Sequence, residues 1–129
     1  MTKKVGVFRN ERGMREAVAA LEEYRRRSAG AAVATQGLRS NQELLERWEL
    51  DNLLDVAMMI AQGAIMRQES RGAHFREDFP ERRDAFQFHT IATMAVFGKV
   101  RFARKPVDMS LWQAGDSYSD RFGVIPRTY

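Results

Sequence analysis

A run of about thirty residues, from Asn41 to Ser70, carries a helical pattern that is apolar on more than one side. Its main apolar positions, three or four residues apart, are Leu50, Leu53, Leu54, Ala57, Ile60, Ala61, Ala64 and Ile65. A second set widens this seam and consists of Leu45, Trp48, Val56, Met58, Met59 and Met66. Such a helix would be about 45 Å long. Because its apolar surface exceeds one face, it needs more than one packing partner.

Local signals predict the ends of two helices. Asn10 is a suitable N-cap and Gly30 a suitable C′ residue, so the first helix is expected at about 10–29. Its apolar face consists of Met14, Ala17, Val18, Leu21 and Tyr24. The second helix is expected at about 41–70, with Ser40 and Glu43 as a capping box and Gly72 as its C′ residue. The glycine-containing loop between them indicates an antiparallel pair.

The last third of the chain lacks helical periodicity. Residues at about 87–105 alternate in the manner of two short strands, which predicts a small β-hairpin ending at Pro106. Residues 106–129 carry scattered aromatic side chains and predict an extended tail that lies on another surface. The whole chain, 1–129, fits a single domain.

Composition excludes several classes of function. The chain has no cysteine, and hence no disulfide scaffold or cysteine-ligated metal centre. It has no run of 18 apolar residues for a membrane span and no G-x-G-x-x-G for a dinucleotide. These features favour a cytoplasmic protein. The net charge is +4, but the surplus cations are dispersed along the sequence, which disfavours nucleic-acid binding.

The segment from Glu69 to Asp84 packs arginines and carboxylates around His74. A metal site there would need three or four converging ligands, and we favour instead a histidine hydrogen-bonded to a carboxylate or a carbonyl. The arginines could grip a dicarboxylate, but neighbouring acids can pair with them internally, so we favour a structural ion-pair network. No nucleophilic triad is present in the sequence, and no catalytic, cofactor-binding or metal-binding residue is expected.

The same segment resembles the SRGAHxRxDxPxRDD signature of the flavoprotein subunit of succinate dehydrogenase and fumarate reductase, a family related to L-aspartate oxidase. Arg83 departs from it, standing where the family usually has the first Asp of RDD. Five further likenesses occur in family order, at Val5–Arg9, Asn41–Ala57, His89–Thr90, Phe102–Val107 and Pro126–Tyr129. The residues of this likeness that we expect to serve structure or an interface are Ser70, Arg71, Gly72, His74, Arg76, Asp78, Arg82, Asp84 and His89. We call residues 70–86 the signature loop.

The resemblance implies a mainly α fold, a truncated spectrin-like three-helix bundle with a hairpin and an extended tail. The first helix of that bundle would lie before Met1, and the exposed seam would favour self-association. The resemblance further implies the C-terminal domain of a larger FAD-dependent succinate/fumarate oxidoreductase of electron transport and the tricarboxylic acid cycle. FAD would be bound elsewhere in the intact subunit, and this chain alone would be inactive.

The implied partners are the FAD-binding domain of the same subunit and the iron–sulfur subunit. The latter could hold the chain at the inner face of the cytoplasmic membrane. An alternative left open by the residues is a stand-alone helical adaptor that binds an acidic protein or nucleic acid.

Overall fold

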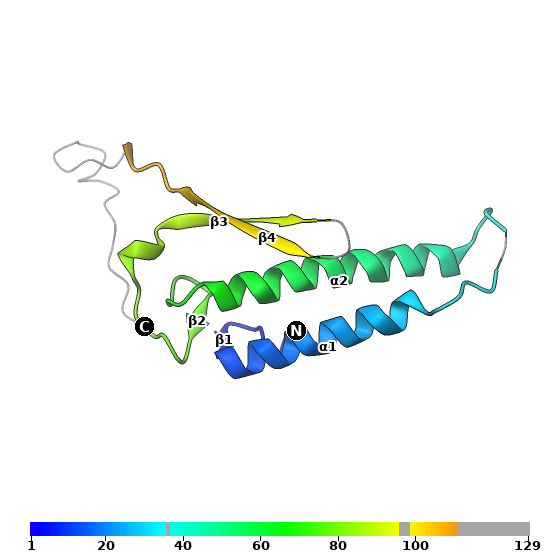
Figure 1. Cartoon of the computed structure of the whole chain (residues 1–129), viewed down its shortest axis with the longest axis horizontal. Helices are drawn as coiled ribbons and strands as arrows, with labels where there is room; N and C mark the ends of the chain where they lie inside the picture. Colours follow the sequence, from blue (N-terminus) through cyan, green and yellow to red (C-terminus); the bar gives the residue numbers. More distant parts are fainter. Residues whose placement is uncertain (36, 96–98, 111–129) are drawn as a thin grey trace.

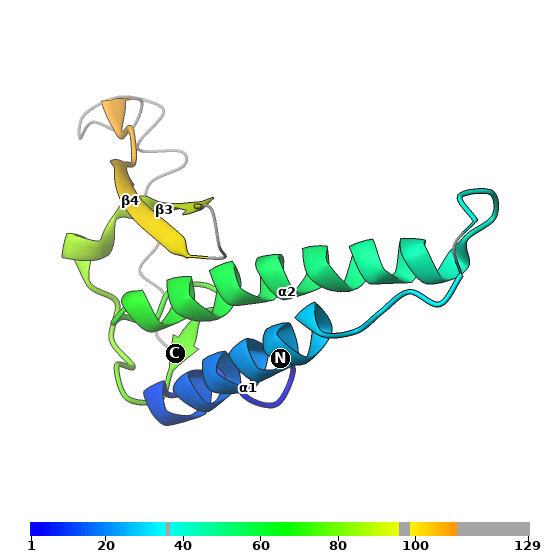
Figure 2. The same ribbon diagram turned by 45° about the vertical axis from the view of Figure 1, so that its right-hand side comes forward.

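The computed structural model describes residues 1–35, 37–95 and 99–110. Helix α1 (Glu11–Ala29) and helix α2 (Gln42–Met66) lie antiparallel, and an antiparallel hairpin covers the other side of α2 (Figures 1 and 2). The hairpin consists of β3 (Phe88–Met94) and β4 (Val100–Pro106). The N-terminal segment runs beside the loop that follows α2 and is joined to it by a short ladder.

The expected truncated three-helix bundle is wrong. The described residues contain two α-helices and two small sheets, and the second partner of α2 is the hairpin. The contact is close at Gly63, where an added Cβ would lie 3.4 Å from the Phe102 ring. The apolar width of α2, which indicated a further helix, is therefore covered in its C-terminal half by a sheet face. The predicted extended tail falls largely on residues 111–129, outside the described part of the chain.

Helix α1 begins and ends where its sequence predicts, but its last turn is not closed by a left-handed glycine. The Asn10 side chain accepts a hydrogen bond from the Gly13 amide at 2.9 Å. The helix stops after Ala29, but Gly30 has a φ of −89°, which is an ordinary right-handed conformation. Gly30 therefore does not act as the left-handed C′ glycine that we expected.

Helix α2 departs from the prediction at both ends. Asn41 is the N-cap and accepts from the Leu44 amide at 2.9 Å, whereas Ser40 lies outside the helix with a φ of +52°. The expected capping box does not form, because Glu43 accepts instead from two amides of the preceding loop, at 3.1 and 3.0 Å. The helix ends at Met66 rather than near residue 70, because Arg67 is extended with ψ of 101°.

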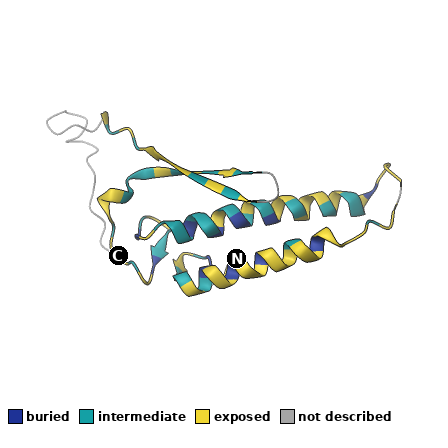
Figure 3. Cartoon of the chain, in the orientation of Figure 1, coloured by how far each residue is buried: buried dark blue, intermediate teal, exposed yellow. Residues whose placement is uncertain are grey.

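The core lies where the two helices face each other (Figure 3). Its buried residues are Val5, Met14, Ala17, Leu21, Leu54, Met58, Ala61 and Ala64. From Leu45 to Ile60, α2 leaves several large apolar side chains exposed. We call these residues the open stripe: Leu45, Trp48, Leu50, Leu53, Val56 and Ile60.

Two sheets complete the fold. Strand β1 (Phe8–Arg9) pairs in parallel with β2 (Phe75–Arg76), and the rings of Phe8 and Phe75 meet edge to face at 5.3 Å. A short 3₁₀ turn, η1 (Asp84–Phe86), leads into the hairpin. The ladder brings the N-terminal segment against the signature loop and so positions the site described next.

Candidate functional site

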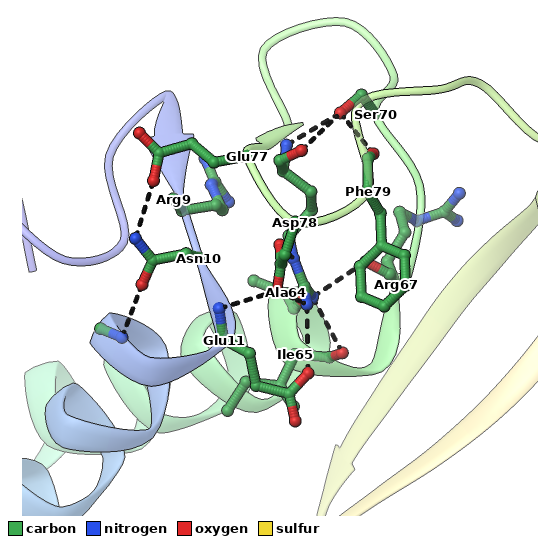
Figure 4. A network of polar contacts seen from close by, with 12 residues as sticks. Arg9, Asn10, Glu11, Ala64, Ile65, Arg67, Ser70, Glu77, Asp78 and Phe79 are labelled. Atoms are coloured by element: carbon green, nitrogen blue, oxygen red, sulfur yellow. Dashed lines mark hydrogen bonds and ion pairs between the residues drawn. The ribbon is translucent and has the colours of Figure 1, made fainter.

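The signature loop folds back between the C-terminal end of α2 and the N-terminal end of α1 (Figure 4). Its tightest point is a turn in which the amides and carbonyls of Arg71 and His74 bond to each other, at 2.9 and 3.1 Å. Gly72 lies inside this turn with a φ of +61°, a conformation that is costly for residues with a Cβ. The glycine of the motif therefore serves this turn, not the end of α2.

Arg76 is fully buried and caps α2. Its Nη1 donates to the carbonyl oxygens of Ala64 and Ile65, both at 3.2 Å, and of Arg67, at 3.3 Å (Figure 4). The last turn of α2 contains no basic residue of its own. Arg76 supplies the positive charge that the unpaired carbonyls at a helix C-terminus favour.

Asp78 performs the matching task at α1. It holds the guanidinium of Arg76 in a bidentate pair, with distances of 2.6 and 2.7 Å, and accepts from the Glu11 amide at 3.0 Å. The Glu11 carboxylate also contacts Arg76, at 3.2 Å. One ion pair thus joins the C-terminus of one helix to the N-terminus of the other, with each charge at the dipole end that stabilises it.

We call Arg76, Asp78 and Glu11 the clasp, and its ion pairs shift the pKa values of its members. The hydrogen bond from Arg76 lowers the pKa of Asp78 below its usual value. Burial lowers the pKa of Arg76, but its contacts with Asp78 and Glu11 outweigh burial and raise that pKa overall. Both groups are therefore charged throughout the physiological range. Arg76 is fully buried and can stay charged there only because its carboxylate partners are in place.

Glu69 is a second fully buried charge in the same region. It accepts from Arg71 at 2.9 and 3.1 Å, from the Arg83 amide at 3.0 Å, and from Arg67. Burial raises the pKa of Glu69, but these hydrogen bonds outweigh it and keep the pKa below normal. Arg67 also donates to the carbonyls of Phe86 and Phe88, at 2.9 and 2.7 Å, and so ties the hairpin to the clasp.

Ser70 holds the strand of the loop that carries Arg76. Its Oγ accepts from the Arg76 amide at 2.8 Å and donates to the Phe79 carbonyl at 2.9 Å. Because Ser70 is completely buried, its hydroxyl cannot bind water, and these two hydrogen bonds satisfy it instead.

His74 lies between Arg9 of β1 and the end of α2. Its Nδ1 is 3.2 Å from Nη1 of Arg9, and its Nε2 is 3.1 Å from the Arg67 carbonyl. A neutral ring with its proton on Nε2 satisfies both partners. Burial lowers the pKa of His74, and the charges of Arg9, Arg76 and Arg67 add to that effect against the opposing carbonyl bond. Across the described residues, no three acids and histidines gather in a way that could hold a metal ion.

The remaining predicted residues are not drawn into this network. Arg82 and Asp84 are 3.9 Å apart, with Asp84 mostly exposed, and the buried Nε of Arg82 has no acceptor within the described chain. His89 lies on the exposed face of the hairpin. Sequence reasoning missed Glu11 and Arg67, because Glu11 is 65 residues from its partner Arg76 and Arg67 was assigned to the helix. The position of Glu11 in the first turn of α1 was the available signal.

A groove of about 360 Å³ lies between α2 and the hairpin, lined in part by Met59, Gly63 and Phe102. Arg67 and His74 lie along it, but both are already engaged by the chain itself. Among the described residues, these two polar side chains of the groove are therefore not free to bind a ligand.

Comparison with known proteins gives one consistent result. The family model described as fumarate reductase flavoprotein C-term matches residues 1–127. The succinate dehydrogenase flavoprotein subunit of Rickettsia felis is 34% identical over 127 residues, covering 98% of this chain and 20% of its own length. The fumarate reductase flavoprotein subunit of Helicobacter pylori is 43% identical over 84 residues, 65% of this chain and 12% of that subunit.

Solved structures agree. A variant of the E. coli quinol fumarate reductase FrdA superposes with a TM-score of 0.78 at 33% identity, over 83% of this chain and 19% of FrdA. A Mycobacterium smegmatis Sdh1 complex gives a TM-score of 0.76 at 25% identity, over 98% of this chain and 22% of that one. This chain thus spans about a fifth of the length of the Rickettsia felis subunit, although nearly all of its own residues are matched. Neither described helix is long and apolar enough to cross a membrane.

Proposed function

Because the chain belongs to the fumarate reductase flavoprotein C-terminal family, we propose that it is the docking domain of an FAD-dependent succinate/fumarate oxidoreductase subunit. In this proposal the FAD and the reacting groups lie in the rest of the subunit. The domain braces the FAD-binding part and the contact with an iron–sulfur subunit, and does no chemistry alone. Membrane association would come through partner subunits.

The open stripe is the observation that carries this proposal. Leu53 is 66% exposed and Trp48 and Val56 are each more than half exposed, on one continuous length of α2. Several large apolar side chains left exposed on one helix indicate a site of contact. The matched relatives are about five times longer than this chain, so most of their length is available to cover such a surface. We assign the FAD-binding part of the same subunit as the occupant.

The signature residues divide into two roles in this proposal. Ser70, Arg71, Gly72, His74, Arg76 and Asp78 hold the loop and the helix ends in one geometry through the contacts described above. Asp84 is mostly exposed and its pair with Arg82 is loose, at 3.9 Å, so these two residues are the ones proposed to contact a neighbouring surface. His89 is exposed on the hairpin and is available in the same way.

A chimera tests the proposal. The matched segment of the Rickettsia felis subunit is replaced by this chain and produced with its partner subunits. We expect bound FAD and co-purification, and we expect Leu53→Lys to reduce both, because a lysine would be buried unpaired at the contact. Leu38, exposed in the loop before α2, supplies the matched control Leu38→Lys. Equal behaviour of the two variants would contradict the assigned contact.

A second variant separates bracing from catalysis. Arg71→Ala removes a partner of the buried Glu69 and is expected to weaken assembly more than flavin chemistry. A fully assembled Arg71→Ala chimera of normal stability without turnover would refute this division of labour. The alternative of a stand-alone adaptor predicts a closed core, which the open stripe does not favour.

A further inference from the structure

The hairpin carries several cations, all on the β4 side, and no acid. Residues 85–107 contain no Asp or Glu, but they contain His89, Lys99, Arg101, Arg104 and Lys105. Within the described part of the chain, none of these four Lys and Arg side chains has a carboxylate partner within 4 Å. Arg71 and Arg76 of the signature loop, in contrast, are held by carboxylates. The cations of the hairpin are therefore available to an external anion.

The strand register gathers some of these cations on one face. His89 lies opposite Lys105, Ile91 opposite Ala103, and Thr93 opposite Arg101. All six side chains are exposed and form what we call the outer face. The intervening residues point toward α2, as Phe102 does at Gly63. Arg104 belongs to that inner side, where its guanidinium lies 4.8 Å from the centre of the Phe88 ring.

The outer face has the layout of a protein interface in miniature. Its centre is Ile91, 44% exposed, beside Ala103. A cation stands at each end, Arg101 and Lys105, which are four residues or about 13 Å apart on one strand. Protein interfaces commonly place an apolar centre inside a charged rim, with arginine enriched.

We propose that the outer face docks an extended acidic segment of a partner protein, in which an apolar residue stands midway between two acids four residues apart. In an extended segment these three side chains point to the same side, at the spacing of Arg101, Ile91 and Lys105. This proposal concerns a surface separate from the open stripe and does not depend on the docking function proposed above.

Other anionic partners fit this face less well. Nucleic-acid binders commonly neutralise about 6–10 phosphates and stack bases on aromatic rings. The outer face has two permanent cations and no Phe, Tyr or Trp. Peripheral membrane binding needs several apolar side chains that enter the lipid, and this face offers Ile91 as its one large apolar group.

The test is a titration of the 129-residue chain, labelled with ¹⁵N, followed through its backbone amide NMR signals. The probe is a capped nine-residue peptide, Gly-Ser-Glu-Thr-Val-Thr-Glu-Ser-Gly. The control peptide, Gly-Ser-Thr-Glu-Val-Glu-Thr-Ser-Gly, has the same composition but places its acids on the side opposite to Val. We expect the first peptide to shift the amides of β3 and β4 and to bind more tightly than the second, with affinity falling as salt increases.

Two charge-matched variants locate the binding. Arg101→Glu with Lys105→Glu is expected to weaken the Kd about tenfold or more, because both ion pairs become repulsions. Lys3→Glu with Arg39→Glu makes the same change in net charge at exposed positions elsewhere and is expected to change the Kd less than about twofold. A milder pair, Arg101→Thr with Lys105→Thr, keeps strand-forming residues and is expected to give an intermediate loss.

Three results would overturn the proposal. Equal losses in the two reversed variants would show that only net charge matters. Tighter binding of single-stranded DNA or of phosphatidylserine vesicles than of the peptide would assign a different class of partner. Unchanged peptide binding by the threonine variant, together with new self-association, would show that the cations only protect an open sheet edge.

Discussion

The two ends of helix α2 differ in which side chains they bury. At its C-terminal end the fully buried side chains include the charged Arg76 and Glu69, each surrounded by internal partners. Along its N-terminal half the exposed side chains include the apolar Trp48 and Leu53. The buried charges at the C-terminal end are paired within the chain. The exposed apolar side chains of the N-terminal half can be buried only by another molecule or segment. Burial and polarity together therefore separate what stabilises this domain from what it offers to a neighbour.

Charged groups at the closed end are expected to contribute geometry more than net stability. A buried ion pair often stabilises no more than apolar residues of equal volume, whereas removal of one member is strongly destabilising. Here the pair fixes how the ends of α1 and α2 meet. The comparison between the two ends makes four predictions, given from the largest expected effect to the smallest.

Replacing Arg76 should be the most damaging change. Arg76→Met leaves Asp78 without its bidentate partner and three carbonyls without their donor. We expect a loss of about 3–5 kcal/mol in the free energy of unfolding, measured by urea denaturation. The control Arg12→Met removes an exposed pair with Glu16 and should cost less than about 1 kcal/mol. Similar losses in both variants would mean that the clasp contributes no more to the free energy of unfolding than an exposed ion pair does.

Two adjacent leucines test the contrast within one helix. Leu54 is 6% exposed and packs in the core, whereas Leu53 belongs to the open stripe. Leu54→Ala should destabilise the isolated chain by about 2–4 kcal/mol, and Leu53→Ala should stay within about 0.5 kcal/mol. Chemical denaturation of both variants measures the difference. A large loss at Leu53 would show that the stripe is already covered by the chain itself.

The turn of the signature loop tests backbone conformation without changing charge. Gly72→Ala places a Cβ on a residue with φ of +61° and should cost about 1 kcal/mol, seen as a lower thermal midpoint. Gly30 has a right-handed φ of −89°, and a Cβ added there would meet only the Arg27 carbonyl oxygen at 3.8 Å, so Gly30→Ala is the matched control. An unchanged midpoint for Gly72→Ala would indicate that the turn adjusts freely.

The smallest effect should appear as pH dependence near His74. Burial and the charges of Arg9, Arg76 and Arg67 lower its pKa in the folded chain, while an unfolded histidine titrates near about 6.5. The contribution of the neutral ring to the free energy of unfolding is therefore fully present above the unfolded pKa. It is lost as the pH falls from there toward the lower pKa of the folded chain. Denaturation between about pH 7.5 and 5.5 should show this decline in the wild type and a weaker one in His74→Gln. His89→Gln, on the exposed outer face, should keep the wild-type decline.

Periodicity and local chemistry predicted much of this fold. Periodicity correctly assigned Leu54, Ala61 and Ala64 of α2 to the core. Three other residues of the predicted seam, Leu50, Leu53 and Ile60, are exposed instead. The alternation of Val100 and Phe102 also follows from the sequence. The internal pairing of Arg71 and Arg76 with nearby acids is confirmed. These features depend on neighbours a few residues apart, where spacing alone decides which side chains meet.

Long-range contacts account for what the sequence did not show. Helix α2 ends at Met66, where Arg76 of strand β2 donates hydrogen bonds to the carbonyls of Ala64 and Ile65. The capping box failed because Glu43 binds the loop before it. A third helix was inferred from resemblance and from the apolar width of α2, but the partner found in the structure is a sheet face, which covers only part of that width.

The β1–β2 ladder has a consequence for the order of folding. It joins Phe8 to Phe75, so the chain between them, with both helices, forms one closed loop. Closing a loop of that length is entropically costly before the helices have turned back on each other. The ladder is therefore expected to form late, after the helix pair, with mutations in it changing the unfolding rate more than the folding rate. The N-terminal segment is thus expected to pair with the signature loop only after the helix pair has formed.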